Sequence, residues 1–214
     1  MKQSNDFVPR VSRSIEASIA TKRDLLRSPE TLSMIAKVSG LLVGALRQGG
    51  KVLLFGNGGS AADAQHIAAE LVGRFAFDRP ALPALALSVN SSCVTAIGND
   101  WGFDQVFARQ LEALALPGDV VVGISTSGNS ANVLHAMSQA REMGLPRVAL
   151  TGRTGGRLKN SVDHCICVPS DETPRIQECH ILIGHILSEL VESELFKKEG
   201  RISRSRRSPR SESS

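Results

Sequence analysis

The fold of this chain is set by residues 51–60, which read KVLLFGNGGS. The apolar run 51–55 is typical of a strand buried on both faces of a parallel sheet. The glycines end that strand, and residues 60–75 have the pattern of a helix. A strand, a glycine-rich turn and a helix start form an anion site, because free N–H groups and the positive end of the helix dipole meet there. The stretch therefore predicts a phosphate site in an α/β fold.

A second stretch, residues 120–130 (VVVGISTSGNS), repeats this arrangement and is followed by a predicted helix over 131–143. Hydroxyl side chains here add O–H donors to the backbone N–H groups. Each loop by itself is compatible with an ordinary strand–helix connection, in which glycine makes the turn and serine caps the helix. The presence of two such loops favours the anion site.

Neither loop matches a nucleotide-binding motif. A dinucleotide fold needs a third glycine and an acid at the end of the next strand. The first loop lacks that glycine, and the predicted strand 84–88 is followed by Val89 and Asn90. A P-loop needs a lysine that both loops lack. Nucleotide binding is therefore disfavoured.

The helix after the first loop carries His66 and Glu70, which lie on one face because they are four residues apart. They follow the glycine loop by one to two turns, about 10 Å. An imidazole and a carboxylate so close to a phosphate site indicate metal binding or proton transfer. This arrangement predicts an enzyme that acts on a small phosphorylated molecule.

Length and charge predict one domain with a short tail. The chain has 214 residues and is 42% hydrophobic, which is enough for one core, expected over about 35–198 of a domain spanning 1–200. The net charge of +4 comes from residues 201–214, which hold five arginines and one glutamate. We expect this Arg/Ser-rich tail to be disordered, and nucleic-acid binding is not expected. No apolar run reaches the ~20 residues of a membrane span, and no signal peptide is apparent, so we expect a cytoplasmic protein.

Strands and helices alternate from residue 51 onward, which predicts a doubly wound, parallel, five-stranded sheet flanked by helices. The predicted strands are 51–55, 84–88, 119–124, 147–151 and 164–168. Ligands of such sheets bind beyond the carboxyl ends of the strands, where both loops fall. Asn99 and Asp100, in a predicted loop before Trp101, are expected to reach the same cleft.

Helices are also predicted at both ends of the domain. Residues 10–27 carry a narrow apolar stripe, and residues 29–48 are apolar on more than one side. These two helices are expected to contact another subunit, with packing on the chain's own sheet as the alternative. A long helix over 173–198 carries a histidine, His185, among apolar neighbours, where an imidazole needs a partner.

The four cysteines form no Cys-x-x-Cys pair. Cys165 and Cys167 share one face of the predicted strand 164–168, and we expect them to be small core residues.

Five ordered motifs resemble those of the bacterial phosphoheptose isomerases of the sugar-isomerase (SIS) superfamily. They are GNGGS at 56–60, QHIAAELVGRF at 65–75, GNDWGF at 98–103, STSGNSANV at 125–133 and RIQECHILIGH at 175–185. The resemblance covers about residues 10–198 and leaves out only the tail.

The resemblance implies a cytoplasmic homotetramer, with sites at subunit interfaces and one Zn²⁺ per subunit. It implies conversion of D-sedoheptulose 7-phosphate to D-glycero-D-manno-heptose 7-phosphate for surface polysaccharide synthesis. The implied substrate-binding residues are Asn57, Gly58, Gly59, Ser60, Glu70, Asn99, Asp100, Ser125, Thr126, Ser127, Ser130 and Gln177. The implied metal ligands are His66, Glu70, Gln177 and His185, with Glu70 and His185 as catalytic base and acid. Asp63 matches a polar position of the family's pocket helix, whereas Pro174 replaces an acid that some members have there.

These residue types suit isomerisation through a cis-enediol, in which a carboxylate moves a proton between carbons and an imidazole moves protons on oxygens. Gln177 and His185 are eight residues apart, about 12 Å along one helix. We therefore hypothesise that the site is completed at a subunit interface, where the last helix meets the 60–75 helix of another chain.

Two other functions remain open. One is isomerisation of a different sugar phosphate, since the phosphate loops would be common to both reactions. The other is a non-catalytic SIS adaptor that binds a replication initiator. The presence of His66, Glu70, Gln177 and His185 favours an enzyme.

Overall fold

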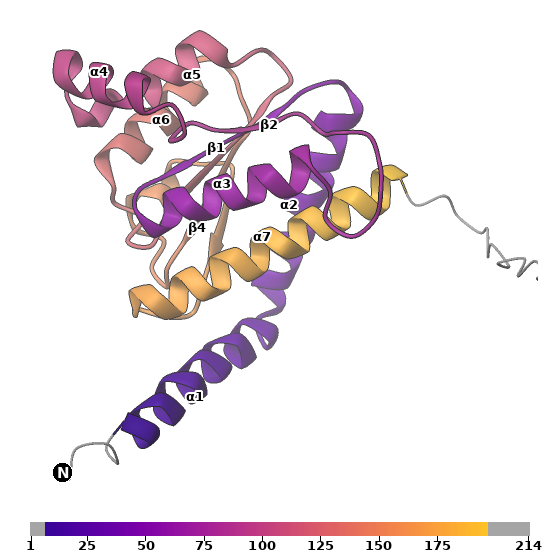
Figure 1. Ribbon diagram of the computed structural model, residues 1–214, viewed down its shortest axis with the longest axis vertical. Coiled ribbons are helices and arrows are strands. Elements are labelled where there is room, and N and C mark those ends of the chain that lie inside the picture. The colour runs from indigo at the N-terminus through magenta and orange to yellow at the C-terminus, as the bar shows by residue number, and fades with distance from the viewer. Residues whose placement is uncertain (1–6, 197–214) are drawn as a thin grey trace, which may run out of the picture.

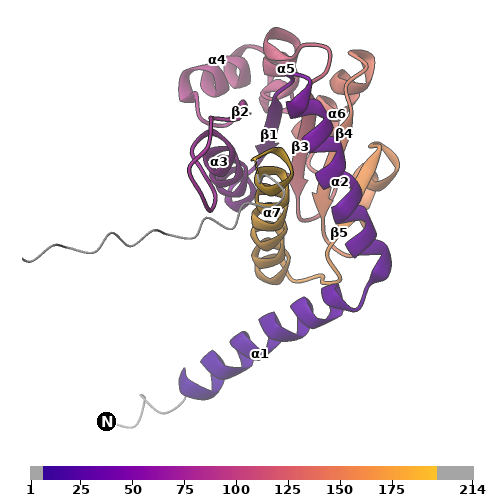
Figure 2. The same ribbon diagram turned by 90° about the vertical axis from the view of Figure 1, so that its right-hand side faces the viewer.

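Five parallel strands form the centre of the protein (Figure 1), and their order is β2-β1-β3-β4-β5 (Figure 2). The computed structural model describes residues 7–196, so the predicted tail at 201–214 lies outside the described residues. The strand bounds are β1 Val52–Gly56, β2 Ala84–Ala86, β3 Val120–Ser125, β4 Arg147–Thr151 and β5 His164–Cys167. The prediction of a parallel five-stranded sheet is confirmed. Strand β2 is shorter than predicted, because the chain turns after Ala86 and the Val89 N–H donates to the Ala86 carbonyl.

Helices cover both faces of the sheet. Alternate residues of β1 point to opposite faces, so that Leu54 enters the core under α2, α3 and α7, while Leu53 enters the core under α5 and α6. The sheet is thus doubly wound, as predicted. The helix bounds are α1 Phe7–Leu26, α2 Pro29–Arg47, α3 Gly59–Val72, α4 Ser91–Trp101, α5 Ala108–Leu114, α6 Ala131–Glu142 and α7 Thr173–Phe196, with short 3₁₀ turns at Phe103–Gln105 and Gly156–Asn160.

Helix α4 corrects a prediction, because Asn99 and Asp100 lie on it rather than in a loop. The Asn90 side chain caps its first turn by accepting from the Cys93 N–H at 3.1 Å. Val94 and Ile97 pack against the core under α5 and α6. The Asn90 cap, together with Val94 and Ile97, which are three residues apart on one face, stabilises helix α4. The sequence pattern does not predict this helix over Asn99 and Asp100.

The two N-terminal helices differ in their packing. Helix α2 buries Val38 and Leu42 against the chain's own sheet, which was the alternative prediction. Helix α1 extends away from the body in both views (Figures 1 and 2), and its contacts with α7 include hydrogen bonds from the Arg175 guanidinium to Ser14. The apolar side chains along most of α1, including Phe7 and Ile15, are exposed.

Helices α3 and α7 lie side by side within one chain (Figure 1). The last helix therefore meets the 60–75 helix of its own chain, contrary to the prediction of a contact with another chain, and completion of the site at a subunit interface stays a prediction. Gly184 of α7 allows the close approach, since a Cβ there would lie 2.5 Å from the Ile67 Cγ1 of α3. This contact is not evident from the sequence, because it depends on how two helices far apart in the chain pack on the sheet.

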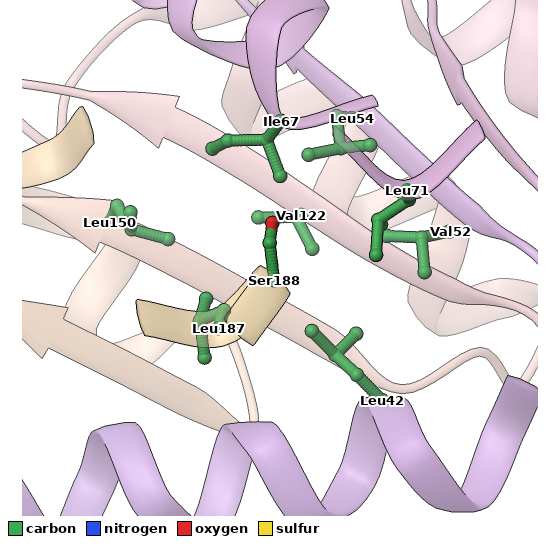
Figure 3. A pocket seen from close by; sticks show the side chains of 9 residues that line it. All are labelled: Leu42, Val52, Leu54, Ile67, Leu71, Val122, Leu150, Leu187 and Ser188. Carbon is green, nitrogen blue, oxygen red and sulfur yellow. The ribbon is translucent and has the colours of Figure 1, made fainter. Parts of the chain in front are cut away.

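An apolar cavity of about 10 Å³ lies between the sheet and helices α2, α3 and α7 (Figure 3). The hydroxyl of Ser188 projects into it and has no hydrogen-bond partner among the described residues. The other lining side chains are aliphatic, among them Leu42, Ile67 and Val122. A water molecule needs two to four polar partners, so this cavity is expected to be dry.

Within residues 7–196, none of the helices combines the length and the apolar character that crossing a membrane requires.

Candidate functional site

The two glycine- and serine-rich loops follow β1 and β3, which are neighbours at the centre of the sheet. The chain leaves β1 for α3 on one face and leaves β3 for α6 on the other. The strand order reverses between these two strands, and such switch points are where open α/β sheets bind ligands. The topology therefore brings both predicted anion loops to one crevice.

The first loop presents uncapped backbone N–H groups. Gly58 has a φ of +55°, which favours glycine, and no side chain caps α3, which begins at Gly59. The Gln177 amide of α7 packs directly on Gly59, where any Cβ would collide with it. Gln177, predicted to bind substrate and metal, thus lies over the first loop.

The second loop gathers hydroxyl groups around a tight turn. The Ser125 Oγ lies 2.9 Å from the Ser130 Oγ and 3.5 Å from the Ser127 Oγ. Gly128, with a φ of +66°, makes the turn and donates its N–H to the Ser125 carbonyl. The Ser130 hydroxyl does not cap α6. The N–H groups that begin this helix are therefore available to an anion, as the sequence predicts.

A pair of asparagines joins the two loops. The Asn57 Nδ2 donates to the Asn132 Oδ1, and the Asn132 Nδ2 donates to the Asn57 Oδ1, both at 2.9 Å. Asn132 is buried at the start of α6. No function is predicted for Asn132 from the sequence, although its place two residues after Ser130 in the second loop motif is a usable signal.

His66, Glu70 and His185 form a cluster beside the first loop. The His66 Nε2 lies 2.9 Å from the His185 Nε2 and 3.2 Å from the Glu70 Oε1. One donor atom from each residue lies within 4.8 Å of the others. Two imidazole nitrogens and a carboxylate oxygen facing one point are a donor set that suits Zn²⁺. The structure thus brings three of the four predicted metal ligands together.

A buried ion pair fixes the segment that follows α3. The Glu192 carboxylate accepts from the Phe75 N–H at 2.8 Å, the Ala76 N–H at 2.7 Å and the Arg79 Nε at 3.0 Å. Burial alone would raise the pKa of Glu192, but these hydrogen bonds hold it below its usual value. They place the Phe75 ring 5.8 Å from the His185 ring. Helix α3 therefore ends at Val72, before the predicted residue 75.

Asp63 lies one turn before His66 on α3. Burial raises the pKa of its carboxyl to about 6, although the nearby His66 partly opposes this. Its Oδ2 is buried and has no hydrogen-bond partner among the residues described. Asp63 thus has an orphaned, buried carboxyl oxygen on the helix that carries His66.

Asn99 and Asp100 are exposed on α4, and the Asn99 Nδ2 donates to the Asp100 Oδ1 at 2.8 Å. Within the described part of the chain, no hydrogen bond connects either side chain with the two loops or with the histidine cluster. Their predicted contact with substrate therefore stays a prediction.

Comparison with known proteins agrees with this geometry. The profile of the SIS domain family matches residues 18–152. A phosphoheptose isomerase of Sulfurimonas denitrificans is 52% identical over 186 residues, which are 87% of this chain and 95% of that protein. One from Roseiflexus is 54% identical over 196 residues, 91% of this chain and 98% of that protein.

Solved structures give the same result. The phosphoheptose isomerase of Neisseria gonorrhoeae superposes with a TM-score of 0.82 at 43% identity, over 87% of this chain and 99% of that chain. The fold, with its two loops at the switch point, is that of an SIS-domain sugar-phosphate isomerase. Within this class, the chain belongs to the phosphoheptose isomerase family.

Proposed function

We propose that the protein interconverts D-sedoheptulose 7-phosphate and D-glycero-D-manno-heptose 7-phosphate, as a step toward surface polysaccharide. The observation that carries this proposal is the His66–Glu70–His185 cluster, which involves the helix that follows the first anion loop. The names of the relatives, all isomerases of a heptose phosphate, support the choice of sugar.

The second loop would bind the phosphate through the hydroxyls of Ser125, Thr126, Ser127 and Ser130 and the N–H groups at the start of α6. The sugar would then extend over the first loop toward α3. It would contact Asn57, Gly58, Gly59 and Ser60, with Gln177 above them. We also assign Asn99 and Asp100 to the substrate, which requires them to approach the sugar from α4.

Proton transfer is assigned to Glu70 and His185. The Glu70 carboxylate would remove the proton from C1 of the ketose and return it to C2, through a cis-enediol. His185 would move a proton between the two oxygens. The Glu70 Oε1 faces His66, which leaves Oε2 for the proton. The contact of Phe75 with the His185 ring would help to orient this imidazole.

We propose that one Zn²⁺ per subunit is held by His66, Glu70 and His185, with the Gln177 amide oxygen as a fourth ligand. The support is the convergence of three donor atoms within 4.8 Å. A bound Zn²⁺ would supply Lewis-acid polarisation of the sugar carbonyl.

We further propose a cytoplasmic homotetramer. The support for subunit contact is helix α1, whose stripe of Phe7, Val11, Ile15 and Ile19 is exposed in the single chain. A contiguous exposed apolar surface of this kind marks a protein interface. Sedimentation of the purified protein would give the number of subunits.

The test of the reaction is NMR in D₂O with sedoheptulose 7-phosphate. We expect aldose to appear, with deuterium entering at the carbon next to the carbonyl. If the sugar phosphate bound without exchange, isomerisation of this sugar would be wrong. Other sugar phosphates would then be assayed, and a complete lack of turnover would favour a non-catalytic adaptor.

A further inference from the structure

A second cluster of metal-ligating side chains lies away from the histidines, on the edge strand β5. Cys165 and Cys167 were expected to be small core residues, but both are only partly buried. Their side chains share one face of the strand, and their Sγ atoms lie 3.7 Å apart. The function proposed above uses neither thiol.

The surroundings of this pair favour the thiolate form of Cys167, whereas the hydrogen bond to Cys167 and burial raise the pKa of Cys165, the donor of the pair. The Thr151 Oγ1 lies 3.5 Å from the Cys165 Sγ and 3.4 Å from the Cys167 Sγ. The hydrogen bond from the Cys165 thiol lowers the pKa of Cys167, burial opposes this, and the Thr151 hydroxyl and the Lys159 ammonium lower it further. Thiolates are the form in which cysteines bind metals.

A disulfide fits this pair less well than a metal ion. Residues i and i+2 of a strand have Cα atoms about 6.6 Å apart, near the upper limit for a disulfide. Zinc–sulfur bonds are about 2.3 Å long, so two sulfurs 3.7 Å apart subtend about 107° at one shared ion. That angle is close to tetrahedral and needs no movement of the backbone.

We propose that Cys165 and Cys167 form a chelating site for a thiophilic, tetrahedral divalent cation such as Zn²⁺ or Cd²⁺. Binding forms two metal–sulfur bonds and releases the two thiol protons to solvent. Because the thiols are partly exposed, water or a small ligand completes the coordination.

The site also lies next to the second loop. A Cβ on Gly155 would lie 3.2 Å from the Cys167 Sγ. On its other side, the Gly155–Gly156 segment packs against the backbone of Ser127 and Gly128. An ion on the thiols would therefore lie next to the Gly155–Gly156 segment, which packs against the second loop. We expect bound ion to raise KM for the sugar phosphate.

The test is a titration with Cd²⁺ alone, followed by the ultraviolet charge-transfer band of cadmium–thiolate bonds. The histidine cluster contains no sulfur and gives no such band. The result is therefore independent of whether His66, Glu70 and His185 bind Zn²⁺. Because the His66–Glu70–His185 cluster can also take up Cd²⁺ without giving the band, we expect the band of the wild-type chain to saturate at one thiolate-bound Cd²⁺ per chain. The double variant C165S/C167S should lose it, and the matched control C93S/C179S should retain it.

Each single variant, C165S and C167S, should weaken Cd²⁺ binding by at least about 10-fold, because chelation by two sulfurs is lost. Circular dichroism would confirm that the variants fold. If the double variant does not fold, the two single variants provide the test. Absence of the band in the wild type, or its persistence in both single variants at unchanged affinity, would overturn the proposal.

Discussion

The side-chain amides of Asn57 and Asn132 form two reciprocal hydrogen bonds, each 2.9 Å long, between residues 75 positions apart in the chain. One amide belongs to the loop after β1, and the other lies in the first turn of α6, just beyond the loop after β3. The pair therefore sets the spacing of the two surfaces that we assign to the sugar and to its phosphate.

The variant N132D should raise KM for the sugar phosphate and lower kcat/KM by about 10-fold or more. The substitution replaces a donor by a carboxylate oxygen, which leaves the Asn57 Oδ1 unpaired and costs about 1–3 kcal/mol. It also places negative charge beside the phosphate loop. Steady-state kinetics measures both constants, with N160A, at an exposed position, as the control. Unchanged KM in N132D would show that the pair does not position the loops.

Removal of either facing imidazole should release the metal. The variants H66A and H185A each lose one of the two nitrogens that lie 2.9 Å apart, and we expect zinc affinity to fall by at least about 10-fold. Zinc content after dialysis, measured by mass spectrometry, tests this directly. The control H135A removes an exposed histidine of α6 and should leave the zinc content unchanged. Equal zinc in all three variants would contradict the ligand assignment.

His180 should make the protein less stable in acid. It is buried on α7, and burial lowers its pKa to about 4, although its hydrogen bond with the Thr151 carbonyl partly opposes this. Between about pH 6.5 and pH 4, His180 is protonated in the unfolded chain and neutral in the folded chain. Lowering the pH through this range therefore favours the unfolded chain. The free energy of unfolding should therefore be unaffected above pH 6.5 and fall by about 3 kcal/mol between pH 6.5 and 4.

Urea unfolding at pH 7.5 and pH 4.5, with chelator present, measures this contribution. The variant H180Q should lose less stability between the two pH values than the wild type, whereas H135Q should behave like the wild type. The same acid dependence in H180Q and in the wild type would show that His180 does not titrate on unfolding.

The hydroxyl of Ser188 should contribute nothing to stability, because it projects unpaired into an apolar cavity (Figure 3). The variant S188A is expected to have an unchanged free energy of unfolding, or one higher by about 1 kcal/mol. The matched control is S39A on α2, where the buried Ser39 Oγ donates to the Ile35 carbonyl at 3.0 Å. That variant should lose about 1 kcal/mol. A loss of stability in S188A as large as in S39A would mean that the hydroxyl has a partner, such as a bound water.

Much of the fold could be predicted from the sequence because its signals are local. Apolar runs identify the strands, and β4 at Arg147–Thr151 has the predicted bounds. The hydroxyl loop at 125–130 is continuous in sequence, and the spacing of His66 and Glu70 by one helical turn fixes their common face. Helix α4 was missed because Gly98, Asn99 and Asp100 have the composition of a loop, while its cap and its partly buried face become evident only in the folded chain.

The sequence by itself identified the candidate site residues, such as His66 and Glu70, and predicted that two glycine- and serine-rich loops lie at one edge of the sheet. Only the tertiary structure decided that His185 faces His66 within one chain, that Asn132 pairs with Asn57, and that two thiols of β5 lie behind the second loop. The physical reason is that backbone propensity and periodicity act over a few residues, whereas these contacts join elements far apart in sequence. Their distances follow from how the helices pack on the sheet, such as the close approach of α7 to α3 that Gly184 permits.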